Sequence, residues 1–210
     1  MPQPESRAPT RDAAFGEGYR LTAVDRFGIW LSSRQIRRHA SFADKRVADF
    51  GCGYHAPFVR SILQQAAHVT LVDVSLAPDL KGHSKITAIE GGLPESLAGI
   101  PDESLDVILC VSVLEHLWEP LRALREFRRL LAPGGTCLLN VPSWRGKFFL
   151  EFSAFRLGLS PESEMDDHKM YYDTRDLWSL LVQAGFRPSR LRCFPHKLGL
   201  NTFAVCKTDG

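Results

Sequence analysis

Residues 47–55 read Val47-Ala48-Asp49-Phe50-Gly51-Cys52-Gly53-Tyr54-His55, and this stretch decides the fold. Its first four residues predict a short strand, a Gly-x-Gly turn follows, and a helix is predicted over 57–67. Glycines let a backbone approach a ligand closely, and the start of a helix offers N–H groups without partners inside the helix. Such turns are also common structural elbows, so the turn alone leaves a ligand site and a plain bend equally open.

Short apolar runs alternate with amphipathic stretches on both sides of this turn. Further strands are predicted over 69–72, 86–90, 105–111, 135–141, 191–194 and 201–207, and further helices over 20–41, 120–131 and 174–184. Strands that alternate with helices indicate a parallel sheet, and right-handed crossovers place helices on both of its faces. The last two strands have a short connection and must be antiparallel. The predicted fold is therefore α/β: a doubly wound, mostly parallel, seven-stranded sheet with a C-terminal antiparallel hairpin.

The composition is that of an ordinary globular protein. A chain of 210 residues favours one domain, which we place at 19–210 after a loose leader at 1–18. The formal net charge of +2 is too small to argue for nucleic acid or a membrane surface. Five cysteines, with no C-x-x-C pair, indicate buried thiols in a reducing compartment. No secretory signal and no membrane-spanning run is visible, so we expect a cytoplasmic protein.

Two carboxylates flank the glycine turn in a meaningful way. Asp73 ends the predicted strand over 69–72, one βαβ crossover beyond Gly51, where an acid can accept both ribose hydroxyls of a nucleoside. The turn also fits the dinucleotide pattern G-x-G-x-x-A with Ala56. Asp49, however, would repel a pyrophosphate and suits a ligand that carries an ammonium group. S-adenosylmethionine carries an ammonium and a sulfonium.

With these residues the sequence resembles the class I, Rossmann-like S-adenosylmethionine-dependent methyltransferases, especially the small-molecule and quinone-biosynthesis group. The resemblance rests on Asp49 to Gly53, Asp73, Leu105 to Ile108, Val113 to Leu117 and Leu130 to Gly135. It implies that the glycine turn holds the methionine part, Asp73 the ribose, the stretch over 90–94 the adenine, and the stretch over 111–113 the region beneath the sulfonium. The implied cofactor-binding residues are Asp49, Gly51, Cys52, Gly53, Asp73, Val74, Gly92, Leu93, Val111 and Ser112. Two positions depart from the family pattern: His55 replaces the third glycine, and Gly92 stands where an acid often contacts adenine.

Two histidines are candidates for proton transfer. Methyl transfer needs mainly alignment, and a general base only for a weakly acidic acceptor such as a hydroxyl. His116 follows the strand predicted over 105–111 and is the first candidate, although the favoured alternative is that the Glu115-His116 pair caps or orients a turn. His168, flanked by Asp167 and Tyr171, is the second. No further metal ligands can be identified beside it, so we predict no metal site.

The stretch over 142–170 is either a packed helix or a substrate lid. Phe148, Phe152 and Phe155 follow helical spacing, with cations between them. A lid would favour an amphiphilic or carrier-linked acceptor. Arg34, Arg37, Arg38 and His39 form a basic cluster that could meet phosphate, although we expect a solvent-exposed face.

The resemblance implies methyl transfer to a small-molecule acceptor, by preference a hydroxyl oxygen of a glycan, lipid or quinone-like precursor, with S-adenosylhomocysteine as product. Three alternatives stay open: a nucleic-acid or protein methyltransferase, a catalytically silent nucleoside-binding scaffold, and a nicotinamide-dependent oxidoreductase. Nucleic acid is not the expected partner, because residues 110–113 lack the Asn-Pro-Pro-aromatic motif of amino-group methyltransferases and no Pro-Cys nucleophile precedes them. The sequence does not indicate the oligomeric state.

Overall fold

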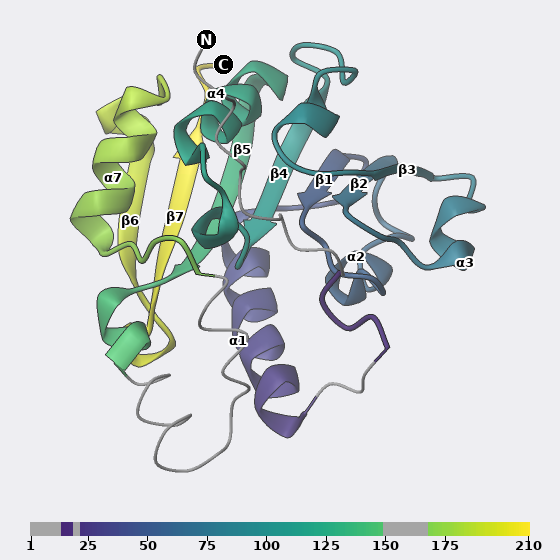
Figure 1. Ribbon diagram of the computed structural model, residues 1–210. Helices are drawn as coiled ribbons and strands as arrows, with labels where there is room; N and C mark the ends of the chain where they lie inside the picture. The colour runs from purple at the N-terminus through teal and green to yellow at the C-terminus, as the bar shows by residue number, and fades with distance from the viewer. Residues whose placement is uncertain (1–13, 19–21, 149–167) are drawn as a thin grey trace, which may run out of the picture.

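A single mixed β-sheet forms the centre of the protein (Figure 1). The computed structural model describes residues 14–18, 22–148 and 168–210. The strand order is β3-β2-β1-β4-β5-β7-β6. The strands are β1 (Arg46–Phe50), β2 (His68–Asp73), β3 (Ile86–Glu90), β4 (Leu105–Val111), β5 (Leu131–Pro142), β6 (Leu191–His196) and β7 (Asn201–Lys207).

The strand directions confirm the predicted architecture. Strands β1 to β5 pair in parallel, and β7 pairs antiparallel with both β5 and β6. The carboxyl ends of the five parallel strands therefore lie along one side of the sheet, which we call the carboxyl edge. The start of β7 lies there too, because Asn201 pairs with Pro142 at the end of β5.

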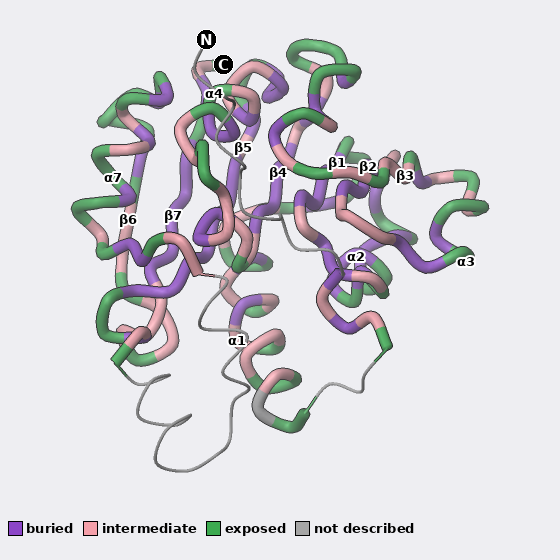
Figure 2. The backbone as a smooth tube through the Cα atoms, in the orientation of Figure 1, coloured by how far each residue is buried: buried purple, intermediate pink, exposed green. Residues whose placement is uncertain are grey.

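Helices cover both faces of the sheet. They are α1 (Ala23–His39), α2 (Pro57–Arg60), α3 (Pro78–Lys81), α4 (Pro120–Leu130) and α7 (Thr174–Gln183), with short 3₁₀ turns η1 (Glu95–Leu97), η2 (Leu114–His116), η3 (Pro188–Arg190) and η4 (Lys197–Gly199). Buried side chains of α4 and α7 form one core cluster with the sheet, and those of α1, α2 and α3 form the other. Figure 2 shows the strands as the most buried part of the chain between these layers.

Helix α4 illustrates how sequence pattern sets this packing. Pro120 occupies its first turn, where the missing N–H costs nothing. Leu124 and Phe127 point to the sheet and are fully buried, and the Phe127 ring lies 5.0 Å from that of Phe50 on β1. Each such side chain contributes about 1.5–3 kcal/mol on burial. Arg122 on the opposite face pairs with Glu95.

Two predicted boundaries are wrong. The helix predicted over 57–67 ends at Arg60, because the amides of Ser61, Ile62 and Gln65 then donate to carbonyls three residues back and form turns. The following amide of Ala67 already donates to Lys45, so the chain turns directly into β2. Strand β5 begins at residue 131 rather than 135, immediately after α4, since Leu131 pairs with Leu105.

Helix α1 extends past the carboxyl edge. Its N-cap Thr22 and Asp25 form a capping box that fixes where it begins. The His39 ring packs on Phe194 and Phe203 near the other end of the helix. In Figure 1 the N-terminal half of α1 lies below the end of β4. Among the described residues, no helix is both long and apolar enough to span a bilayer.

Candidate functional site

The glycine turn follows β1 at the carboxyl edge. Gly51 has φ +75°, and a Cβ there would lie 2.1 Å from Cγ2 of Val113. Gly53 has φ +74°, and its Cβ would lie 3.0 Å from the carbonyl oxygen of Phe15. Both positions need the left-handed backbone that glycine adopts without strain, and both need the missing side chain. The two glycines of the motif are therefore required by the fold itself.

Asp73 links this turn to the end of β2. Its Oδ2 accepts a hydrogen bond from the amide of Gly53 and its Oδ1 one from the amide of Val74, each at 2.8 Å. An ionised carboxylate offers about four acceptor positions. Asp73 therefore orients the glycine turn and can still accept hydroxyl groups of a ligand. The structure places Asp73 and Val74 where the sequence predicted them, beside the turn.

Asp49 lies at the middle of the sheet, one strand from Asp73. Its side chain is buried, and it pairs in register with Leu71 on β2 and Leu109 on β4. Burial, together with the negative charge of Asp73, raises the pKa of Asp49 from 3.8 to about 7. Among the described residues, no cation and no hydrogen-bond donor offsets these effects. A ligand with a positive group would stabilise both carboxylates, which is the chemistry that an ammonium ligand needs.

The remaining predicted cofactor residues lie at neighbouring strand ends. Burial raises the pKa of the Cys52 thiol, so this side chain is a neutral filler of the turn and no nucleophile. Gly92 follows β3 and is exposed, and Leu93 beside it packs against the core. Val111 ends β4, and Ser112 adopts φ +55° while its amide donates to the carbonyl of Asn140. The predicted set therefore spans the contiguous ends of β3, β2, β1 and β4.

The two candidate histidines lie side by side. The rings of His116 on η2 and His168 have centroids 4.8 Å apart. His168 Nδ1 lies 3.1 Å from the Tyr171 hydroxyl, so this contact fixes the orientation of its imidazole. The amide of Lys169 donates to the carbonyl of Glu115 at 2.7 Å and holds the two segments together. Residues that are 52 positions apart in the sequence therefore form one cluster after β4.

Glu115 completes a group that could also hold a metal ion. Glu115, His116 and His168 offer one ligand atom each, and these atoms lie within 4.8 Å of one another. Imidazole and carboxylate together suit zinc and other first-row transition metals. The sequence-based prediction of no metal site had not included this group, because nothing in the sequence places residue 168 beside residue 115. The cluster can therefore serve as a base or as a cation ligand set.

Sequence reasoning missed five residues near the site, which are Phe15, Glu17, Ser75, Asn140 and Lys197. The carbonyl of Phe15 accepts from the amide of Tyr54 at 2.9 Å, and Ser75 donates to Glu17. Residues 14–18 thus contact the glycine turn, although the leader was expected to be loose; residues 1–13 lie outside the described part. Asn140 is fully buried at the end of β5, and its side-chain amide has no hydrogen-bond partner in the described structure. A polar residue inside the apolar run 137–141 was the available signal.

Lys197 is the last missed residue. It lies on η4, and burial lowers its pKa while the Glu115 carboxylate opposes that effect. Its Nζ comes within 3.6 Å of the Cβ position of Gly28 on α1.

The predicted lid over 142–170 is described only at its ends: residues 144–148 are helical, and residues 149–167, which include Phe152 and Phe155, lie outside the described residues.

Comparisons with known proteins show the family of this chain. A family model described as a methyltransferase domain matches residues 25–190. The chain is 27% identical over 171 residues to a probable S-adenosylmethionine-dependent methyltransferase of Mycobacterium tuberculosis H37Rv, covering 78% of this chain and 57% of that protein. It is 31% identical over 150 residues to the ubiquinone biosynthesis O-methyltransferase of Nitrosococcus oceani, covering 66% and 62%. The chain thus spans less than two thirds of the curated relatives that it matches.

A solved structure shares the fold. The S-adenosylmethionine-dependent methyltransferase of Aquifex aeolicus aligns with a TM-score of 0.60 at 18% identity, covering 84% of this chain and 88% of that one. The described strand order and the antiparallel placement of β7 are therefore those of a Rossmann-like methyltransferase sheet.

Proposed function

We propose a function from one premise: this chain belongs to the class I S-adenosylmethionine-dependent methyltransferase family. The proposed reaction transfers a methyl group from S-adenosylmethionine to a hydroxyl oxygen of a small amphiphilic acceptor. The observation that carries the proposal is the pair Asp49 and Asp73 beside a glycine turn that is too tight for any side chain. A buried carboxylate with a raised pKa favours a cationic ligand.

The residues of the site fit this cofactor. The buried carboxylate of Asp49 is suited to bind an ammonium group, and the carboxylate of Asp73 offers acceptors for ribose hydroxyls. Gly92 leaves room beside the end of β3 for the adenine, since nothing lies within 4 Å of a Cβ there. When bound, the cofactor supplies an electrophilic methyl group on a sulfonium. The protein contributes alignment of the acceptor and exclusion of water, and proximity can account for about 7–11 kcal/mol of the barrier.

The proton of the acceptor hydroxyl has a receptor in the histidine cluster. His116 and His168 lie together after β4, so either imidazole can take the proton as the oxygen forms its bond to the methyl carbon. Tyr171 contacts Nδ1 of His168 and thereby orients its imidazole ring beside that of His116. We assign the base to this pair. The relatives named ubiquinone biosynthesis O-methyltransferases support a hydroxyl oxygen as the acceptor.

The primary test is calorimetric titration of the whole protein with S-adenosylhomocysteine, followed by a coupled assay of its formation with prenylated catechols and phenols as acceptors. We expect binding and turnover. His116→Ala and His168→Ala should each lower kcat more than the cofactor affinity, and the kcat of each variant should depend less on pH. Asp79→Ala on the exposed part of α3 is the matched control with unchanged binding.

The outcomes separate the remaining alternatives. A chain that binds no nucleoside is not a methyltransferase, and this result would reject the proposal. Binding without turnover on any acceptor would support the scaffold alternative. We also propose the cytoplasm as its location, which the five free cysteine thiols support.

A further inference from the structure

The exposed apolar side chains gather on one side of the protein. In the described chain the large exposed ones are Phe27, Trp30, Trp118, Trp144, Phe148, Met170, Trp178 and Leu198. All except Trp178 belong to α1 or to connections that follow β4, β5 and β6 at the carboxyl edge. Scattered apolar residues on a surface need no explanation, but a gathering beside a substrate site indicates an interaction surface.

The first half of α1 carries the most prominent pair. Phe27 is 59% exposed and Trp30 is 51% exposed, and their rings stack with centroids 5.8 Å apart. The helix is held at its other end, where Ile36 is buried and His39 packs on β6 and β7. The N-terminal half of α1, which carries these two exposed residues, extends beyond the sheet (Figure 2).

Cations accompany these aromatic rings. The Arg34 guanidinium carbon lies 5.7 Å from the ring centroid of Trp30. Lys169 Nζ lies 5.2 Å from Trp118, and Lys147 Nζ lies 5.9 Å from Phe148. Three separate segments at the carboxyl edge therefore repeat one combination, an exposed aromatic ring with a positive group above it.

The charge of α1 has one sign along its outer face. Its one acidic residue, Asp25, is used in the capping box. A shallow hollow of about 470 Å³ is lined by Trp30, Ser33, Arg34, Arg37 and Arg38, with no acidic residue among them. Arg37 is engaged with Ser61, whereas Arg34 and Arg38 form no salt bridge with any residue that the structure describes. The net charge of +2 is a sum over the whole chain, and it does not show that positive charge is concentrated on this face.

We propose that this surface, the α1 rim of Phe27, Trp30, Arg34 and Arg38, docks on an anionic phospholipid membrane and turns the carboxyl edge toward the bilayer. Aromatic rings are favoured at the level of lipid headgroups, and arginines bind lipid phosphates. A second copy of this chain is a poorer occupant, because a two-fold contact would bring the same arginines together.

The orientation has a consequence for the substrate. The histidine cluster and the glycine turn lie on the same edge as the α1 rim, so an acceptor embedded in lipid could reach them without leaving the membrane. Membrane docking of the α1 rim does not require methyl transfer. Only this access of a lipid-embedded acceptor to the site rests on the proposed function.

The test is co-sedimentation of the whole protein, without cofactor, with vesicles of phosphatidylcholine alone or of an equimolar mixture with phosphatidylglycerol. We expect binding to the anionic vesicles that weakens as salt is raised. Phe27→Ser combined with Trp30→Ser should lower the partition coefficient at least about tenfold. Arg34→Gln combined with Arg38→Gln should lower it about fivefold for each charge removed.

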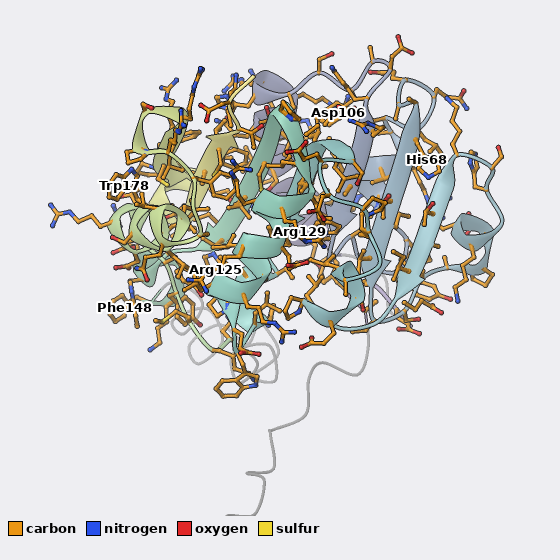
Figure 3. The ribbon with its side chains drawn as sticks, turned by 90° about the horizontal axis from the view of Figure 1, so that it is seen from above. His68, Asp106, Arg125, Arg129, Phe148 and Trp178 are labelled. Atoms are coloured by element: carbon orange, nitrogen blue, oxygen red, sulfur yellow. The ribbon has the colours of Figure 1, made fainter. Side chains whose placement is uncertain are left out.

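Matched controls lie elsewhere on the surface. Trp178 on α7 and Arg125 on α4 are both exposed and are labelled in Figure 3. Their helices pack in the other core cluster from α1. Trp178→Ser and Arg125→Gln should leave vesicle binding unchanged. All four α1 positions are exposed, so the variants should keep the native circular dichroism spectrum.

Three results would overturn the proposal: no vesicle binding, equal binding to neutral and anionic vesicles, or equal loss in the controls. Self-association of the wild type that disappears in the aromatic variant, without vesicle binding, would assign the rim to a second copy and also reject it. Calorimetry with S-adenosylhomocysteine keeps the two proposals apart. If the protein binds S-adenosylhomocysteine but not vesicles, only the membrane-docking proposal is rejected. If it binds vesicles but not S-adenosylhomocysteine, only the proposed enzymatic function is rejected.

Discussion

The affinity for the cofactor should depend on pH through one carboxyl group. Burial and the charge of Asp73 raise the pKa of Asp49 to about 7. If an ammonium ligand binds only when Asp49 is ionised, about one molecule in eleven is competent at pH 6 and nearly all at pH 8. S-adenosylhomocysteine should therefore bind about tenfold more tightly at pH 8, with close to one proton released on binding at pH 6.

The same pKa affects folding. The unfolded carboxyl titrates near 3.8, so the folded state binds more protons between about pH 4 and pH 7. Stability from this group is therefore present at low pH and is lost as the pH rises through that window. The loss reaches at most about 4 kcal/mol. Asp49→Asn should unfold at a higher urea concentration than the wild type at pH 8, and should lose the pH dependence of binding.

The assay is calorimetric titration at pH 6 and pH 8 in two buffers of different ionisation enthalpy, which counts the protons released. Urea unfolding of both proteins at pH 5 and pH 8 provides the stability arm. Equal affinity at the two pH values, or a pH dependence that persists in Asp49→Asn, would show that Asp49 does not face the ammonium. Asp73, the other carboxyl group nearby, is unchanged in Asp49→Asn. A pH dependence of binding that came from Asp73 would therefore persist in this variant.

Three further predictions follow from the same turn and cluster. Asp73→Ala should weaken S-adenosylhomocysteine binding at least about tenfold, since each hydrogen bond to a charged acceptor contributes about 1.5–3 kcal/mol; Asp79→Ala should not, and equal affinities by calorimetry would refute the ribose assignment. Gly51→Ala should lower the free energy of unfolding by about 2 kcal/mol or more in urea, because its Cβ overlaps Val113 in a left-handed backbone. Gly92→Ala meets no atom within 4 Å and should be nearly neutral. Chelation of divalent cations should leave turnover unchanged, whereas a requirement for added zinc or magnesium would assign the histidine cluster to a cation.

The strands were predictable because each pattern is local. Apolar runs such as residues 105–111 predict a buried strand without knowledge of the rest of the chain, and Gly185 marks the end of the last helix. The short α2 was not predictable, because the chain after Arg60 forms turns that bring Ala67 to Lys45, where its amide donates to the Lys45 carbonyl just before β1 and β2 pair. Tertiary contacts decide such boundaries.

The sequence predicted which residues lie around the glycine turn, the proposed cofactor side, but it did not predict which residues lie together on the proposed acceptor side. Asp49, the glycine turn and Asp73 follow one βαβ unit, whose spacing is fixed by the fold. His116 and His168 were singled out separately, yet only the folded chain shows that they are neighbours. Lys197 lies on the turn between β6 and β7, and Asn140 lies near the end of β5. At such positions the spacing along the sequence does not indicate which residues will lie beside them.

The contact between Phe15 and the glycine turn extends the site beyond the region that identifies the family. The family match begins at residue 25, yet the backbone oxygen of Phe15 borders Gly53 and bonds to Tyr54. A nucleoside bound at this turn would therefore also border a segment with no part in the shared motifs. Under the proposed function, two enzymes with the same glycine motif would then differ beside the nucleoside through residues outside the matched region.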